Sequence, residues 1–134
     1  MKKIALIVFA MLFLAAGLVG CGEYSSHYHA VGHVVSAHSD SAWMSFIEFE
    51  GTEVFKLKRK SGDLTTIRYS GSLETGNLTV YYDCGGKKLE LFSLSAGDEI
   101  ESSGGYLPED TVYVIVETTE KCCNGALSFE IASD

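Results

Sequence analysis

The chain has 134 residues and a formal net charge of −8 at pH 7. This length allows one domain and is too short for two domains that each bury a core of their own. Hydrophobic residues make up 46% of the chain and charged residues 21%, a balance that excludes an intrinsically disordered protein.

The first twenty residues have the pattern of a secretory leader. Lys2 and Lys3 precede an uncharged apolar run over 4–17, which is shorter than the ~20 residues that a spanning helix needs. The run leads into Leu18-Val19-Gly20-Cys21, which resembles the lipobox of bacterial lipoproteins. That resemblance implies cleavage before Cys21 and a diacylglyceryl lipid on its thiol. An ordinary leader with a free cysteine and a retained membrane anchor are the alternatives.

Loss of residues 1–20 removes two of the ten basic residues and none of the eighteen acidic ones, so the mature chain carries a net charge of −10. This charge predicts repulsion of nucleic acids and of anionic lipid headgroups. A lipid on Cys21 predicts a protein anchored to the cell membrane and facing its extracytoplasmic side, where disulfides persist. No cofactor other than this covalent lipid is expected.

Residues 21–42 are rich in Ser, His, Gly and Ala and are predicted to form a flexible tether with a reach of roughly 25 Å. All four histidines lie in it: His27, His29, His33 and His38. Because imidazole is the commonest metal ligand near neutral pH, metal capture is one alternative function. A plain polar spacer is the other reading, because the spacings match no structural zinc module.

From residue 43 to residue 134, apolar residues recur at every second position and turn residues interrupt them roughly every 8–12 residues. This pattern predicts a single antiparallel β-sandwich, jelly-roll-like, with seven to eight strands. Turns are expected at 61–63, at 84–87 and at Asn124-Gly125. The expected strands are 43–49, 54–60, 64–70, 77–83, 88–94, 111–118 and 126–132, with a weaker one around Ile100.

The order of these strand and turn residues also resembles that of small secreted lipoproteins of Gram-positive bacteria. More distantly, it resembles the jelly-roll-like sandwich modules attached to secreted peptidases. The motif includes Phe49-x-Gly51, Gly62-Asp63-Leu64, Tyr113-x-Ile115 and Asn124-Gly125. The resemblance implies a fold and an extracytoplasmic location. Those lipoproteins have no agreed activity, so it implies no catalytic or binding residue.

Three cysteines remain after Cys21: Cys84, Cys122 and Cys123. A disulfide from Cys84 to one of the adjacent pair requires the two turns to lie at the same end of the sandwich. A full crossing strand around Ile100 would place them at opposite ends. A strained Cys122–Cys123 disulfide, a three-thiolate metal site and reduced thiols are the alternatives.

The sandwich lacks histidine, G-x-S-x-G and H-E-x-x-H, so the sequence predicts that the protein is not an enzyme. The leading hypothesis is a non-catalytic binding or interaction module at the cell envelope, with an envelope protein or a glycan as partner. Four aromatic residues could stack on sugar rings, which makes a carbohydrate-binding module an alternative: Trp43, Tyr81, Tyr106 and Tyr113.

Two charged clusters complete the candidates. The acidic residues at 98–101 and 109–110 are either solvated loops or calcium ligands. The basic run Lys56-x-Lys58-Arg59-Lys60 is either a protected strand face or a docking patch for an acidic partner.

Overall fold

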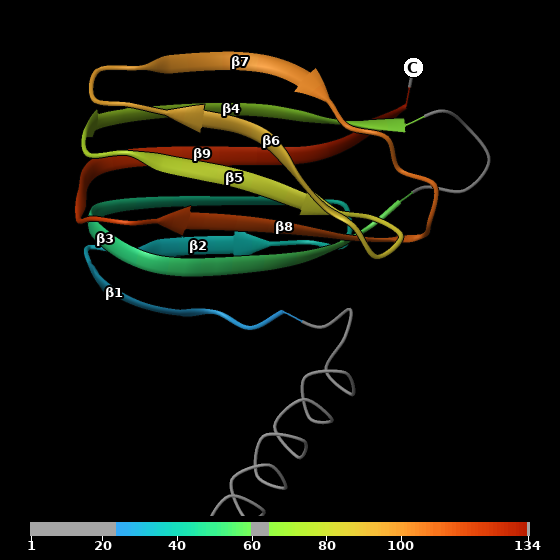
Figure 1. The fold of residues 1–134 in the computed structure, drawn as a ribbon, viewed down its shortest axis with the longest axis horizontal. Coiled ribbons are helices and arrows are strands. Elements are labelled where there is room, and N and C mark those ends of the chain that lie inside the picture. Colours follow the sequence, from blue (N-terminus) through green and yellow to red (C-terminus); the bar gives the residue numbers. More distant parts are fainter. Residues whose placement is uncertain (1–23, 60–64, 134) are drawn as a thin grey trace, which may run out of the picture.

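The computed structural model describes residues 24–59 and 65–133. The predicted leader, the predicted lipidation of Cys21 and the predicted turn at 61–63 lie outside these residues. Within the described part, all regular structure is β-strand (Figure 1), and no helix there has the length and hydrophobicity to cross a membrane. The strands are β1 (His27–Val31), β2 (Val34–Ala37), β3 (Ser41–Lys58), β4 (Thr65–Thr75), β5 (Leu78–Asp83), β6 (Lys88–Leu94), β7 (Glu99–Gly104), β8 (Thr111–Thr118) and β9 (Cys122–Ser133).

The long strand β3 belongs to both layers of the fold. Residues 41–49 pair with β9, whereas residues 52–58 pair with β8, and the ribbon curls from one layer to the other between them (Figure 1). Gly51 lies at this bend with φ of 130°, and an added Cβ would lie 2.5 Å from the backbone oxygen of His27. Only glycine accommodates both the positive φ and the close approach.

Two antiparallel sheets result from this bend. We call sheet I the layer formed by β2, the first half of β3, β9, β4 and β7, and sheet II the layer formed by the second half of β3, β8, β5 and β6. The predicted all-β antiparallel sandwich is therefore confirmed.

Aromatic rings from the two sheets meet in the core. Phe55 of sheet II lies 6.0 Å from Phe129 of sheet I, and Tyr69 of sheet I stacks on Phe92 of sheet II at 4.4 Å between ring centroids. Buried rings of this size contribute most of the apolar area in a small core. The predicted inward positions on 54–58, 65–69, 78–82 and 127–131 are buried.

Three local predictions need correction. The expected strands 43–49 and 54–60 are, over their described residues, parts of the one bent strand β3. Asn124-Gly125 lies inside β9 rather than in a turn, because Gly125 provides the space over which the Phe46 ring packs, 2.4 Å from where a Cβ would stand. In β6, Phe92 and Leu94 are buried instead of Leu89, because the register with β5 shifts at Val80/Tyr81.

The predicted flexible tether is wrong for its described part. β1 and β2 pair antiparallel with β3, with Tyr28 opposite Gly51 and Val35 opposite Met44. The free edge of β3 offers unpaired backbone groups, and these two short strands satisfy them. Residues 24–42 are therefore part of the sandwich.

Candidate functional site: a groove on sheet I

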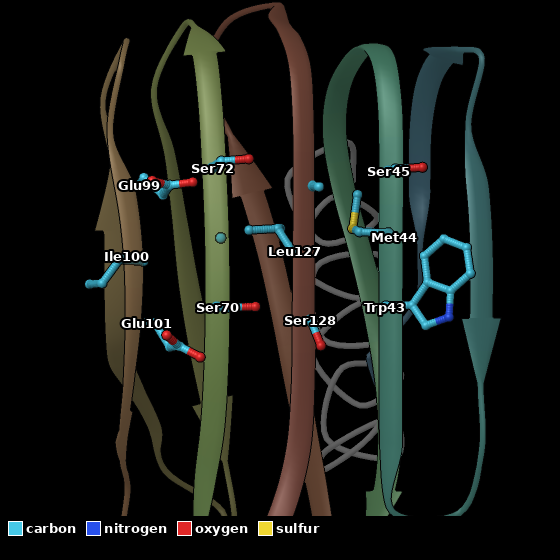
Figure 2. Close-up of a pocket in the computed structure, with 12 residues that line it drawn as sticks. Trp43, Met44, Ser45, Ser70, Ser72, Glu99, Ile100, Glu101, Leu127 and Ser128 are labelled. Carbon is cyan, nitrogen blue, oxygen red and sulfur yellow. The ribbon is translucent and has the colours of Figure 1, made fainter.

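The outer face of sheet I carries a groove of about 740 Å³. It spans β3, β9, β4 and β7 (Figure 2). The strand registers align its outward side chains in two rows that run across the sheet. One row is Trp43, Ser128, Ser70 and Glu101, and the next is Ser45, Ala126, Ser72 and Glu99.

The groove exists because its middle is built from small side chains, which leave space between the two walls. Within the groove, serine and alanine occupy the outward positions of β9 and β4, while Leu127 of β9 and Met44 of β3 point into the core and are buried. The floor therefore presents hydroxyl groups on a rigid, packed sheet.

The two walls differ in chemistry. Trp43 is 43% exposed, and its indole projects from β3 toward β2 at one edge (Figure 2). Glu99 and Glu101 stand on β7 at the opposite edge (Figure 2). Arg68 and Glu130 form an exposed ion pair at 3.2 Å, and they lie two residue pairs along the strands from the Trp43 row. The arrangement suits a ligand that has both an apolar face and hydroxyl groups.

The outer face of sheet II is occupied by the chain itself. We call residues 24–26 the N-terminal strap. The Tyr24 hydroxyl donates to Oδ2 of Asp83 at 2.5 Å, its ring meets that of Tyr113 edge-on at 5.2 Å, and the Val54 N–H donates to the Ser26 hydroxyl at 2.7 Å. Ile115 points away from the core on this face and is still only 1% exposed.

Asp83 links the strap to the β5–β6 turn. It is 4% exposed, and its Oδ1 accepts the Gly86 N–H at 2.8 Å while its Oδ2 accepts the Tyr24 hydroxyl. The predicted turn at 84–87 is confirmed, with Gly85 and Gly86 at positive φ.

A buried histidine–carboxylate pair lies between the first strands and β3. Nε2 of His33 is 2.9 Å from Oε1 of Glu53, and the rings of Tyr28 and Phe49 surround the imidazole. Burial raises the pKa of the Glu53 carboxyl, and the nearby His33 and Ser26 oppose that rise. Burial also raises the pKa of Tyr28, and the charge of Glu53 adds to this.

This pair brings a histidine into the sandwich, where the sequence predicted none. Glu53 lies between Ser26 and His33, whereas a catalytic triad needs the histidine between the hydroxyl and the carboxylate. The pair therefore serves to hold β1 and β2 against β3.

The four histidines do not form a metal site. His27, His29 and His38 are exposed, and His33 is committed to Glu53. Over residues 24–59 and 65–133, no three His, Cys, Asp or Glu side chains are arranged to hold a metal ion.

The candidate disulfide from Cys84 to one of the adjacent pair is not formed. Cys84 follows β5 and its thiol donates to the Glu109 carbonyl, whereas the Cys122 thiol donates to the Asn77 carbonyl, which precedes β5. The strand between them spans about 20 Å, far beyond the ~7 Å limit for a bridge. β7 is a full crossing strand, which is why the two turns lie at opposite ends. All three described cysteines are free, and burial raises the pKa of Cys84 and Cys122.

Of the four predicted aromatic residues, only Trp43 lines the groove. Tyr81 and Tyr113 belong to sheet II, where Lys88 lies over the Tyr81 ring at 4.5 Å and Lys56 lies 6.0 Å from the Tyr113 ring centroid. Tyr106 is 70% exposed in the loop before β8. The predicted common platform is therefore not formed. The serines of the groove were missed, although their outward positions on β4 and β9 carry small or polar residues. Glu99 and Glu101 were considered only as calcium ligands or as part of a solvated loop, and they line the groove from β7.

These observations define a β-sandwich protein with an open groove on one face. No protein-family model and no curated protein sequence matches the chain. Solved structures similar to it include a family 61 carbohydrate-binding module in complex with β-1,4-galactotriose, at 10% identity and a TM-score of 0.47, with 82% of this chain and 86% of that chain covered.

A family 29 carbohydrate-binding module aligns at 15% identity and a TM-score of 0.44, covering 81% of each chain. A cupin-2 domain protein from Shewanella frigidimarina aligns at 12% identity and a TM-score of 0.37, covering 78% of this chain and 83% of that one. At this level of similarity, the ligand of this chain has to be inferred from its own residues.

Proposed function

We propose that this protein is a non-catalytic binding module, anchored by a lipid on Cys21 to the extracytoplasmic side of the cell membrane, that holds a neutral glycan in the groove of sheet I. The observation that carries the proposal is the exposed Trp43 indole at the end of a row of hydroxyl side chains.

A sugar ring matches this chemistry. Its C–H face packs on an aromatic ring, and its hydroxyl groups donate to serine oxygens and to carboxylates. Glu99 and Glu101 at the far wall disfavour an anionic polymer. A single aromatic ring in an open groove predicts modest affinity, with a Kd on the order of 0.1–1 mM.

Two features support a binding role over hydrolysis. Glu99 and Glu101 stand on the same strand and at the same wall, so they cannot flank a glycosidic bond from its two sides. The buried carboxylates lie elsewhere: Glu53 is held by His33, and Asp83 by Tyr24 and Gly86.

The anchor rests on the lipobox-like residues Leu18–Cys21. Intact-mass spectrometry of the membrane fraction tests it, with acyl chains expected on a chain that begins at Cys21. Cys21→Ser is the matched variant and should lose both the acyl mass and the processing. A wild-type chain without acyl mass contradicts the anchor.

Trp43 is the only tryptophan in the chain, so its fluorescence reports directly on the groove. Titration with neutral gluco-, galacto- and manno-oligosaccharides should give a saturable emission change with at least one series. Calorimetry should show at least about a tenfold loss of affinity for Trp43→Ala, equivalent to about 1.4 kcal/mol.

Tyr106→Ala is the matched control, because it removes an exposed ring outside the groove and should bind like the wild type. A wild type that binds none of the three series, or equal losses in both variants, contradicts the glycan proposal.

A further inference from the structure

The strap fixes the point at which the chain leaves the sandwich. Tyr24 is held by Asp83 and Tyr113, and Ser26 by the backbone of Val54. All three partners belong to sheet II. The described chain therefore begins on the outer face of this sheet.

Chain length then limits the distance to the lipid. Cys21 precedes Tyr24 by three residues, and three residues span at most about 11 Å. A lipid on Cys21, which is part of the proposed function, would therefore bring the bilayer surface close to sheet II. A flexible tether of 20 residues would have left this orientation free.

Basic side chains gather around the same point. They are five of the seven described lysines and arginines. One cross-strand row contains Lys56, Tyr113, Asp83 and Lys88, and Lys58 lies opposite Thr111 two pairs further along, on the same face. The five are Lys56, Lys58, Arg59, Lys87 and Lys88.

Two of these five are already paired within the protein. Arg59 meets Asp110 at 3.5 Å, and Lys88 meets Glu117 at 2.5 Å. In the part of the chain that the structure describes, Lys56, Lys58 and Lys87 have no carboxylate partner. Their charges remain available to an external anion.

The groove side has the opposite balance. The two remaining described cations are neutralised, Arg68 by Glu130 and Lys121 by Glu48. Glu99 and Glu101 add negative charge at the groove wall. The described cations are thus unevenly divided between the two faces.

We propose that the outer face of sheet II docks on anionic phospholipid headgroups, so that the groove of sheet I faces away from the bilayer. The headgroup charge acts over about 8–10 Å at physiological salt, which is the range that the short link to Cys21 allows. The expectation that this acidic chain avoids anionic lipids considered its total charge, whereas docking depends on the face that meets the membrane.

The test uses the lipidated protein in vesicles of phosphatidylcholine and phosphatidylglycerol that carry a nitroxide on the lipid headgroup. The nitroxide quenches tryptophan only at short range. In the wild type, Trp43 reports on the groove face. In the double variant Trp43→Phe/Tyr81→Trp, the single tryptophan reports on sheet II. We expect several-fold stronger quenching in the double variant than in the wild type.

The role of charge is tested in the same double variant. Adding Lys56→Glu, or leaving out phosphatidylglycerol, should lower the quenching several-fold. Lys121→Glu makes the same charge change in the turn between β8 and β9 and should leave it unchanged. Omitting phosphatidylglycerol needs no substitution beyond the two that place the reporter, so it does not depend on the folding of Lys56→Glu.

Equal quenching of the two reporters, or equal effects of Lys56→Glu and Lys121→Glu, overturns the docking proposal. Intact mass is measured on each sample first. An unacylated protein overturns the anchor and with it the docking, whereas an acylated protein with equal quenching overturns the docking alone. Glycan binding is measured separately, and its result tests neither the lipid anchor nor the docking.

Discussion

Side chains alternate in the same way along the strands of both sheets, but one outer face of the sandwich is open and the other is covered by the chain itself. On sheet I, the outward residues that β9 and β4 contribute to the groove are small and leave an open space beside Trp43. On sheet II, the outward residues are larger, and the chain's own strap lies against Tyr113 and Asp83. An outward position is therefore not the same as an exposed one.

The difference comes from a segment that is distant in sequence. Tyr24 and Asp83 are separated by 59 positions, and Ser26 and Val54 by 28. The alternation within each strand decides which side chains leave the core, but only the path of residues 24–26 decides which outer face they cover.

The largest expected effect compares one carboxylate on each face. Asp83→Ala removes a buried acceptor from Tyr24 and Gly86 and should lower the free energy of unfolding by about 2–3 kcal/mol. Glu101→Ala, on the open groove wall, should change it by less than about 0.5 kcal/mol. Urea denaturation monitored by circular dichroism measures both. Similar costs for the two variants would mean that the strap does not hold Asp83.

A smaller effect isolates the strap itself. Tyr24→Phe keeps the ring on Tyr113 and removes the hydroxyl that Asp83 accepts, so stability should fall by about 1 kcal/mol. Hydrogen exchange of the β1 amides should accelerate with it. Tyr106→Phe is the control, because the Tyr106 side chain is exposed. If Tyr24→Phe lowers the free energy of unfolding no more than Tyr106→Phe does, the strap does not stabilise the outer face of sheet II.

The pH dependence tests the buried pair under β1 and β2. Burial raises the pKa of Glu53 above its ordinary 4.5, so the folded state holds this proton more tightly than the unfolded state. The resulting stabilisation is present at low pH and is lost as pH rises from about 4.5 through the raised pKa.

The free energy of unfolding of the wild type, relative to that of Glu53→Gln, should therefore fall across this window. Glu50→Gln removes an exposed carboxylate from the same strand and should give a constant difference. Parallel slopes for the two variants would contradict the burial of Glu53.

The smallest expected effect is none. Because Cys84 and Cys122 lie at opposite ends of β5, a thiol reductant should leave the unfolding midpoint unchanged.

Cys123, which is partly exposed, should react first with a thiol reagent, because burial raises the pKa of the other two described thiols and only the thiolate reacts. If the first thiol to react is still present in Cys123→Ser, the assignment of that reaction to Cys123 is wrong.

Local pattern predicts much of this fold. Thr111–Thr118 is β-branched and alternates, and it forms β8 with the predicted bounds. β1 and β2 escaped prediction because edge strands bury little, so His27 and His29 stand exposed where a buried strand would place apolar side chains.

The site is less predictable because it depends on pairing between distant strands. Ser70 and Ser128 become neighbours only through the register of β4 with β9. Trp43 lies on a different sheet from Tyr81 and Tyr113 because β3 bends at Gly51 and changes sheets. The alternation of side chains within a strand predicts neither of these relationships.

The last strand, β9, lies in the middle of sheet I, between β3 and β4. Its paired residues are 48 or more positions away along the chain, as Thr75 and Cys123 show, so this layer cannot assemble before β9 has been synthesised. Folds dominated by such long-range pairing form slowly. For the proposed export of this chain, the delay would keep the polypeptide unfolded while it passes through a translocation pore.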